Sequence, residues 1–119
     1  MDGRISILRD KFLENLQHQW TIEAMADAVK LSPSHLQKLF KTETGMPPIA
    51  YLREKRLEKA CALLEAEDWE QINQIGKQVG MPNDSHFTRD FKKKYGVTPT
   101  EYRKIHWDKI EAERQNGQK

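Results

Sequence analysis

The chain carries two copies of one sequence pattern, and this repeat constrains its fold more than any other feature. The segment Ser34–Lys41 aligns with Ser85–Lys92 at an offset of 51 residues, with Ser-His at the start and Phe-Lys at the end of both. The match continues at three further pairs of positions: Gly45 with Gly96, Pro48 with Pro99, and Tyr51 with Tyr102. Upstream the offset is 50, so the second copy has one extra residue in its turn. Because the matches include a helix-ending glycine and a helix-opening proline, the sequence predicts the same local structure twice.

The first copy predicts a short helix, a tight turn and a second helix. Thr21 is the expected N-cap of a helix over 22–29, because apolar residues follow it at helical spacing. Ser32 then supplies a capping hydroxyl, and Pro33 suits the first helical position, where no N–H is needed. This second helix should end near Gly45. The layout is that of a helix-turn-helix unit, whose second helix enters the major groove of DNA.

The second copy predicts the same layout. Asp68 is the expected cap of its short helix, and Asn83 or Asp84 begins a second helix that ends at Gly96. A small residue is needed where the two helices of a unit cross, because their backbones approach closely there. Gly76 fills that place here, as Ala26 does in the first copy.

The rest of the chain also favours helices, so we predict an all-α fold. The expected parts are a first helix near 4–17, a first helix-turn-helix over 21–45, a linker helix over 48–67, a second helix-turn-helix over 69–96, a last helix over 98–107 and a polar C-terminal tail over 108–119. β-branched residues never alternate over four or more positions, so no segment favours a strand. From residue 111 onward Ala112 is the one apolar residue, and this end is expected to fray.

Positive charge is concentrated in the two copies, although the net charge of the whole chain is only +2. Residues 30–56 and residues 86–104 each carry a net charge of +4, whereas residues 57–72 between them carry −4. The small total excludes a uniformly basic protein that coats polyanions, but it allows two locally basic faces. Taken alone, the same pattern also fits ordinary solvated helix faces.

The predicted linker helix has a length that suits DNA. Some twenty helical residues extend roughly 30 Å at ~1.5 Å per residue. Successive major-groove faces on one side of B-DNA lie roughly 34 Å apart. One chain would then place two recognition helices in adjacent major grooves without a second subunit.

Other classes of protein find little support in the sequence. The single cysteine, Cys61, excludes a disulfide framework and a cysteine-based zinc site. The four histidines are far apart, so no metal site is expected, and no cofactor is implied. No run of apolar residues approaches the roughly 20 that a membrane span needs. Glycine-rich phosphate loops and the common hydrolase motifs are missing, so we do not expect an enzyme.

The chain resembles the DNA-binding domain of the AraC/XylS family of bacterial transcription regulators over most of its length. The likeness rests on Leu31–Leu36, Phe40-Lys41, Gly45, Arg56-Leu57, Ala60 and Leu63-Leu64 in the first half, and on Ile75, Gly80, Ser85–Phe87, Phe91-Lys92, Gly96, Thr98-Pro99 and Tyr102-Arg103 in the second. It implies an AraC-type domain over 4–105 with seven helices, two helix-turn-helix units and sequence-specific promoter binding. Gly76 stands where the family usually has alanine, which lowers helix propensity by about 1 kcal/mol, and Met81 stands where phenylalanine is usual. Both departures suggest a softer second unit.

The open faces of the second helices supply the candidate DNA contacts. Gln37 can pair with adenine, Lys38 can donate to guanine, and the planar fork of Arg89 matches guanine best. By the resemblance, the base-reading positions are Ser34, Gln37, Lys38, Ser85, His86 and Arg89. Helix-end positions that suit phosphates better are Lys41, Lys92, Lys93 and Thr98. Thr98 also fits a plain N-cap, and Asp84 fits an N-cap or a base contact equally well.

A second group of residues is assigned to structure. The expected core positions are Leu36, Leu39 and Phe40 in the first copy, Phe87 and Phe91 in the second, and Cys61 in the linker. Arg56 is interpreted as a structural contact of the linker helix, ahead of a DNA ligand. Trp20, Trp69 and Trp107 are spaced like separate packing anchors, and a platform for single-stranded nucleic acid is not expected.

We therefore expect a cytoplasmic regulator that binds specific double-stranded promoter DNA, with RNA polymerase as a further partner and no membrane association. The alternative is a helical protein-interaction module whose basic faces bind an acidic partner. About four residues precede the first helix, which indicates either a small standalone regulator or the C-terminal domain of a longer one. The chain itself is expected to be a monomer, and a dimer if it belongs to a longer protein.

Overall fold

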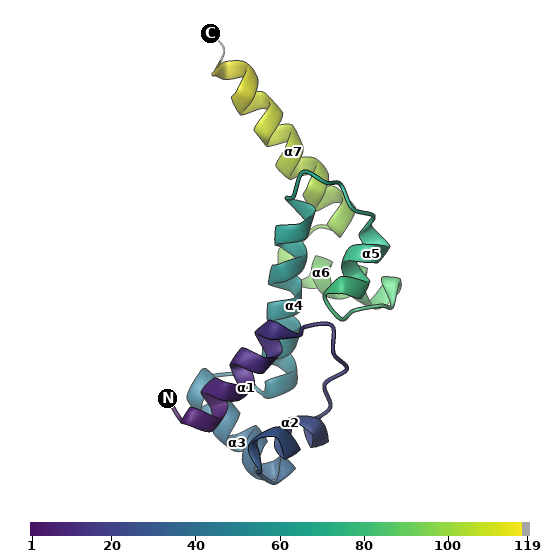
Figure 1. Ribbon diagram of the computed structural model, residues 1–119. Coiled ribbons are helices and arrows are strands. Elements are labelled where there is room, and N and C mark those ends of the chain that lie inside the picture. Colours follow the sequence, from purple (N-terminus) through teal and green to yellow (C-terminus); the bar gives the residue numbers. More distant parts are fainter. Residues whose placement is uncertain (118–119) are drawn as a thin grey trace. The chain divides into compact units, whose positions relative to one another are not determined.

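The computed structural model describes residues 1–117, and over this range the chain forms seven α-helices and no β-strand (Figure 1). The helices are α1 (Gly3–Glu14), α2 (Ile22–Val29), α3 (Pro33–Thr44), α4 (Pro48–Leu64), α5 (Ile72–Gln78), α6 (Asp84–Tyr95) and α7 (Pro99–Asn116). They divide into a first unit, Met1–Arg56, and a second unit from Leu57 onward, so that the division falls inside α4. The predicted all-α fold with two helix-turn-helix subdomains is confirmed.

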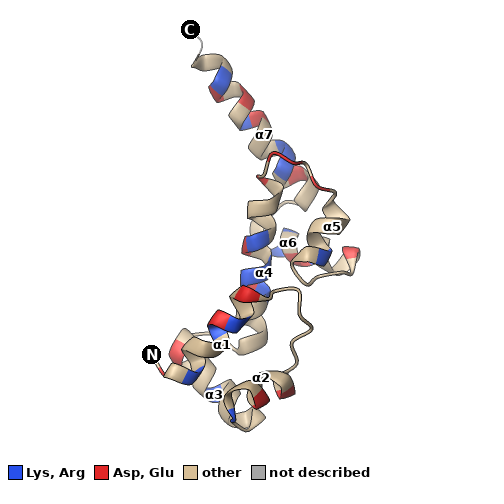
Figure 2. Cartoon of the chain, viewed as in Figure 1, with Lys and Arg blue, Asp and Glu red and all other residues tan. Residues whose placement is uncertain are grey.

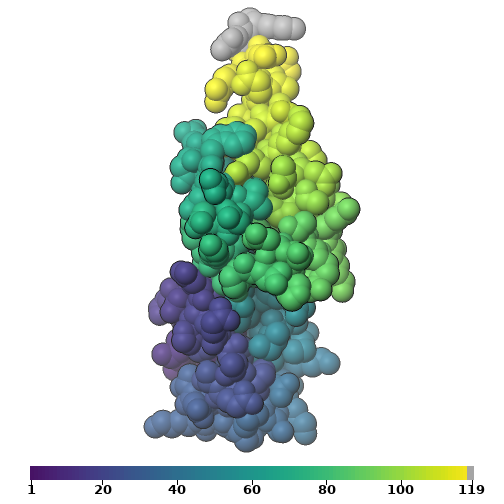
Figure 3. Space-filling model, turned by 90° about the vertical axis from the view of Figure 1, so that its right-hand side faces the viewer, coloured from purple at the N-terminus to yellow at the C-terminus, as the bar shows by residue number. Residues whose placement is uncertain are grey.

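In the first unit, α1, α2 and α3 pack around one apolar core. The buried residues are Ile5, Leu8 and Phe12 from α1, Met25, Ala26 and Val29 from α2, Leu36 and Phe40 from α3, and Leu52 from α4. The Phe12 ring lies among aromatic neighbours, with its centroid 5.3 Å from that of Trp20 and 6.1 Å from that of Phe40. Figure 3 shows the atoms of α1, in purple, directly against those of α2, in dark blue. Because Leu36 and Phe40 anchor α3 by one side, its other side is left to solvent.

The second unit repeats this arrangement around its own core. The buried residues are Leu57, Ala60 and Leu64 from α4, Ile75 and Val79 from the α5 region, and Phe87 and Phe91 from α6. The Phe91 ring has its centroid 4.7 Å from that of Tyr95 and 5.5 Å from that of Tyr102. Cys61 is half-buried and packs against this core, as expected. Burial, together with the neighbouring thiol, raises the pKa of Tyr102.

Most helix ends lie where the capping residues predict them. In four helices the side chain of the N-cap residue accepts a hydrogen bond from the backbone N–H three residues later. These pairs are Thr21 with Ala24 (3.0 Å), Ser32 with His35 (3.2 Å), Asn83 with His86 (2.9 Å) and Thr98 with Glu101 (3.2 Å). Gly45 and Gly96 end α3 and α6 with φ of 84° and 81°, in the left-handed region that favours glycine. Asn83 is thus the N-cap of α6, and Asp84 is its first helical residue.

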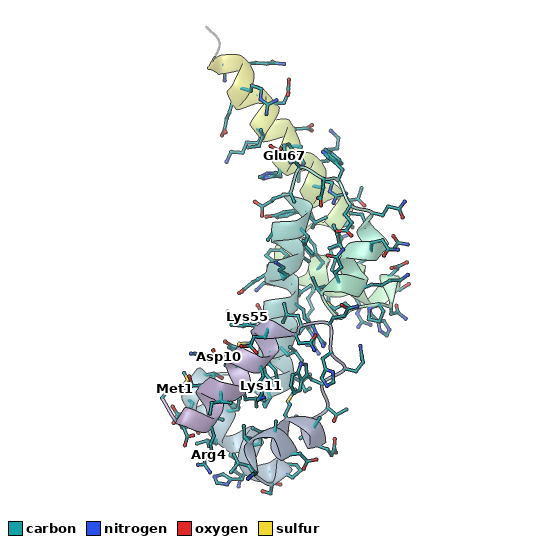
Figure 4. All side chains as sticks on the ribbon, viewed as in Figure 1. Met1, Arg4, Asp10, Lys11, Lys55 and Glu67 are labelled. Atoms are coloured by element: carbon teal, nitrogen blue, oxygen red, sulfur yellow. The ribbon has the colours of Figure 1, made fainter. Side chains whose placement is uncertain are left out.

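α1 ends at Glu14, although the apolar spacing through Leu16 predicted a helix to about residue 17. The reason is a contact from α4, because Arg56 donates from Nε to the carbonyl oxygen of Leu16 (2.9 Å) and from Nη2 to that of His18 (2.8 Å). These bonds hold the chain in a turn after α1. Burial lowers the pKa of Arg56, and its predicted structural role is confirmed. α1 itself keeps charged side chains in solvent, among them Arg4 (Figure 4).

Replacing Arg56 by methionine is expected to lower the free energy of unfolding by about 1–3 kcal/mol, because two backbone carbonyls lose a charged donor. Lys59→Met, an exposed change in the same helix, serves as the control and should alter stability by no more than ~0.5 kcal/mol. Urea unfolding followed by circular dichroism measures both. Equal effects of the two substitutions would contradict the structural role of Arg56.

The end of α4 differs from the prediction. The helix stops at Leu64, where a continuation to residue 67 was expected, and Asp68 caps no helix. Arg103 of α7 donates from Nε to the carbonyl oxygen of Leu64 (3.4 Å), which satisfies a helix-end carbonyl from outside the helix. The N-cap position of α5 is Gln71, and its side chain makes no capping hydrogen bond.

α7 is longer than predicted, because it runs to Asn116 where a last helix over 98–107 was expected. Most of the predicted polar tail is therefore helical, and only residues 118–119 lie outside the described residues. Acidic and basic residues are interspersed along α7 (Figure 2), and Lys104 pairs with Asp108 one turn later at 2.6 Å. Such i,i+4 pairs stabilise a helix that has few tertiary contacts.

Gly76 occupies a crowded position between α5 and the turn that follows. A Cβ atom at this residue would lie 2.8 Å from the carbonyl oxygen of Met81 and 3.1 Å from Cδ2 of Phe87. The N–H of Met81 also donates to the carbonyl oxygen of Gly76 at 2.7 Å, which closes the turn against the helix. Glycine here is required by the packing, in addition to lowering the helix propensity as the sequence indicated.

Candidate nucleic-acid interface

The solvent side of α3 carries four of the predicted contact residues. Ser34, Gln37, Lys38 and Lys41 are all exposed, opposite the buried side of the helix. Lys38 and Lys41 have no hydrogen bond or ion pair with any residue in the described part of the chain. The Gln37 amide nitrogen makes only a long bond, 3.4 Å, to the carbonyl oxygen of Pro33. The polar ends of these side chains are available to an external partner.

α6 presents the corresponding surface in the second unit. Phe87 and Phe91 face the core, whereas Ser85, His86 and Arg89 are exposed. The equivalent helices of the two units thus show the same division into a buried aromatic side and a solvated polar side.

Arg89 is the permanently charged residue among the candidate base-reading positions of α6. Its side chain is 66% exposed, and Nε lies 3.2 Å from Oδ1 of the neighbouring Asp90. Because the Arg89 side of this pair lies largely in solvent, the pair contributes little to stability, and breaking it costs little when the guanidinium meets another acceptor. Asp84 is also exposed, and because Asn83 caps the helix, the carboxylate of Asp84 is not needed for capping.

The candidate phosphate-binding residues lie at helix ends. Lys41 is in the last turn of α3, and Lys92 and Lys93 are in the last turn of α6; all three are exposed. Lys94 follows them, with Nζ 5.3 Å from the centroid of the Tyr95 ring. The charge on this helix comes from flexible side chains that reach into solvent.

Thr98 differs from the other phosphate candidates, because its hydroxyl takes part in a capping box. The hydroxyl accepts from the N–H of Glu101 (3.2 Å), and the N–H of Thr98 donates to Oε1 of Glu101 (2.9 Å). These hydrogen bonds lower the pKa of Glu101. The structural role of Thr98 is therefore an N-cap, and its phosphate contact stays a prediction.

Thr98→Ala is expected to lower the free energy of unfolding by about 1 kcal/mol at neutral pH, since α7 loses its cap. Most of the lowering of the Glu101 pKa should survive in this variant, because alanine keeps the backbone N–H that donates to the carboxylate. Thr100→Ala is the matched control, because Thr100 lies two residues later and is exposed. A cost of Thr98→Ala no larger than that of the control, measured by urea unfolding, would contradict the capping role.

Some features of the second unit were not expected from the sequence. Trp69 and Trp107, predicted as separate anchors, have ring centroids only 5.9 Å apart. Arg103 is buried, and its guanidinium carbon lies 5.2 Å from the centroid of the Trp69 ring. No periodicity links these three residues, so their contact depends on how α7 packs. Among the described residues, no group of histidine, cysteine and acidic side chains could hold a metal ion. None of the helices in residues 1–117 combines the length and the apolar composition of a membrane-spanning segment.

The chain is similar to known transcription regulators. A family model described as a helix-turn-helix domain matches residues 25–105. The HTH-type transcriptional regulator MtrA of Neisseria gonorrhoeae is 31% identical over 103 residues, which are 87% of this chain and 34% of MtrA. The xylose operon regulatory protein of Escherichia coli K12 is 39% identical over 84 residues, which are 71% of this chain and 21% of that protein. The chain spans about a third or less of the length of these curated relatives.

Solved structures show the same fold. The C-terminal domain of AraT, a response regulator from Geobacillus stearothermophilus, superposes with a TM-score of 0.81 at 30% identity, covering 87% of this chain and 86% of that one. The DNA-binding domain of the transcription factor AdpA, solved in complex with a target DNA, gives a TM-score of 0.86 at 22% identity, covering 91% and 96%. At that identity the likeness to AdpA concerns the fold alone.

Proposed function

The chain belongs to the AraC-type helix-turn-helix family of transcription regulators, and on this premise we propose that it binds a specific double-stranded DNA site through α3 and α6. The observation that carries the proposal is the repeated surface of these two helices. Each is the second helix of a helix-turn-helix unit, is anchored by buried apolar residues, and exposes a serine, a basic residue and further polar side chains. A helix in this place of the motif enters the major groove.

Base recognition is assigned to the exposed side chains nearest the start and middle of each helix. In α3, Gln37 would pair with adenine and Lys38 would donate to guanine, with Ser34 beside them. In α6, Arg89 would donate two parallel hydrogen bonds to guanine, with Ser85 and His86 beside it. These assignments come from the resemblance and from side-chain chemistry, and the exposure of all six residues supports them.

We further propose that the two helices occupy adjacent major grooves. α4 supports this, because it is a single helix of 17 residues, about 25 Å long at ~1.5 Å per residue. It is shorter than the predicted linker helix, yet it remains close to the scale of one turn of B-DNA, roughly 34 Å. A bipartite DNA site read by one chain follows from the proposal.

Phosphate contacts are assigned to Lys41, Lys92 and Lys93, with Thr98 as a fourth candidate. Contacts of this kind position a protein on DNA without reading its sequence. The affinity for DNA should therefore fall steeply as the logarithm of the salt concentration rises.

The alternative function is that of a helical protein-interaction module. Tight binding to an acidic protein, together with no binding to DNA at low salt, would favour it.

Lys93→Ala is expected to weaken binding to specific and random DNA by the same factor, and to reduce the slope of log affinity against log salt by about 1. Fluorescence anisotropy with labelled duplexes at four or more salt concentrations measures both quantities. Lys77→Ala, which removes an exposed lysine from α5, is the control and should leave the slope unchanged. A loss confined to the specific site would show that Lys93 contacts a base.

The biological setting follows from the family. We propose that residues 4–105 form the DNA-binding part of a bacterial transcription regulator that acts in the cytoplasm on promoter DNA. RNA polymerase is the partner that such a regulator would contact. Binding, and not catalysis, is the activity that the exposed surfaces of α3 and α6 support.

A further inference from the structure

A cavity of about 290 Å³ lies in the second unit, beside α7 and the turn between α4 and α5. Its apolar walls are Trp69, Ile72 and Trp107, and Arg103, Lys104 and Asp108 are its charged neighbours. The turn that carries Trp69 begins near Glu67, which is labelled in Figure 4. This volume is near the lower end of the ~300–1,000 Å³ usual for small-molecule sites.

Two buried hydrogen-bond donors beside this cavity have no acceptor in the described part of the protein. They are Nη2 of Arg103 and Nε1 of Trp107. Buried donors are nearly always paired, because leaving one without an acceptor costs a large part of its desolvation energy. Both groups are donors, so the missing partner must be an acceptor.

Arg103 also brings a positive charge that its surroundings do not neutralise. The residue is only 7% exposed, and its guanidinium forms no ion pair with any acidic residue within residues 1–117. The Nε–H of the guanidinium is occupied, since it donates to the carbonyl oxygen of Leu64. Nη2 has no acceptor in the same part of the chain and remains for an anion. A carboxylate suits it best, because a charged acceptor strengthens the bond from the guanidinium and its second oxygen can accept from another donor.

Trp69 covers this guanidinium and is placed to move. Its ring lies over Arg103 at 5.2 Å, yet 55% of the residue is exposed to solvent. Its φ of 51° lies in the left-handed region, which is strained for a bulky side chain. The following helix, α5, starts without a side-chain cap. Displacement of the exposed indole would uncover the guanidinium of Arg103.

We propose that this cavity binds a small apolar carboxylate, which enters as Trp69 swings away. The carboxylate accepts hydrogen bonds from Nη2 of Arg103 and Nε1 of Trp107, and its apolar body packs against Ile72 and the indole of Trp107. Lys104 and Asp108 pair with each other at the rim, so they add no net charge to the site. The volume is on the scale of a small molecule. The site is independent of the DNA-binding surfaces proposed above.

The test titrates the full chain, without DNA, with three probes of similar size: phenylacetate, its neutral isostere phenylacetamide, and the cation phenethylamine. Calorimetry and tryptophan emission should show saturable binding of phenylacetate below about 10 mM, as expected for a ligand of ten heavy atoms. Phenylacetamide, which lacks the charge, should bind at least about 10-fold more weakly, and phenethylamine should not bind.

Three substitutions locate the site. Trp107→Phe keeps a ring and removes the donor, so the affinity for phenylacetate should fall about 3- to 10-fold. Arg103→Gln should abolish saturable binding. Because it also removes the contact to the carbonyl oxygen of Leu64 and so lowers the stability of the fold, Trp107→Phe is the decisive variant. Trp20→Phe, a tryptophan of the first unit, is the matched control and should leave the affinity unchanged. The proposal is overturned if phenylacetate does not saturate, if phenylacetamide binds equally well, or if Trp107→Phe behaves like the control.

Discussion

Arg89→Ala is expected to weaken binding to the chain's own DNA site by about 1–3 kcal/mol, roughly 5- to 160-fold, while binding to random DNA barely changes. The reason is that a guanidinium donating to guanine O6 and N7 makes a contact that the wrong base cannot replace. The Arg89 side chain is 66% exposed, and its guanidinium contacts Asp90 through Nε, so its other nitrogens can donate to a base. Anisotropy titrations with the specific site and a random duplex of equal length measure the two affinities.

Two further variants sharpen this prediction. Arg89→Lys keeps the positive charge and loses the planar fork. It should therefore bind random DNA as tightly as the wild type does, and its affinity for the specific site should lie between those of the wild type and Arg89→Ala. Lys93→Ala, which is assigned to a phosphate, should weaken both DNAs equally. If Arg89→Ala lowered the affinities for specific and random DNA by the same factor, Arg89 would be a phosphate contact. The assignment of Arg89 as a base-reading residue would then be wrong.

Gly76→Val is expected to lower the free energy of unfolding by about 3 kcal/mol or more, although valine has the higher helix propensity. The Cβ alone would lie 2.8 Å from the carbonyl oxygen of Met81, which is backbone and cannot rotate away. The γ carbons would add contacts with the Phe87 ring, which belongs to the core beneath α6. Urea unfolding followed by circular dichroism and tryptophan emission gives the stability.

Gly3→Val is the matched control for this substitution. Gly3 is also helical, but a Cβ there meets no atom within 4 Å, so the change should stay within about 0.5 kcal/mol. The free energy of unfolding of Gly76→Ala should lie between those of Gly76→Val and Gly3→Val. Alanine gains about 1 kcal/mol in helix propensity, but its Cβ meets the same close contact. Equal stabilities of the Gly76 and Gly3 variants would contradict the crowding at residue 76.

The elements that the sequence predicted well are those fixed by local chemistry. The limits of α3 are set by Ser32, Pro33 and Gly45, and those of α6 by Asn83 and Gly96. Each of these residues acts on the backbone directly beside it. The same holds for the buried sides of these helices, since Leu36, Phe40, Phe87 and Phe91 follow helical spacing. The exposed surfaces that we assign to DNA follow from the same pattern.

The features that sequence reasoning missed depend on contacts between distant residues. The end of α1 is set by Arg56, about 40 positions away, and the end of α4 contacts Arg103, which lies 39 positions away. Trp69 and Trp107 meet only because α7 packs beside the α4–α5 turn. The continuation of α7 to Asn116 needs no core, because its alternating charges and the Thr98 cap support the helix locally. Polar composition alone had suggested a frayed tail there.

The central claim is that two copies of one helix read two parts of a single DNA site. Selection of bound sequences from a random duplex pool, carried out with the wild type, Gln37→Ala and Arg89→Ala, tests it most directly. We predict one bipartite motif whose halves are centred about one helical turn, or ~10 base pairs, apart. Gln37→Ala should relax preference in one half and Arg89→Ala in the other. The absence of any enriched motif, or a single short motif that both substitutions alter at the same positions, would contradict the claim.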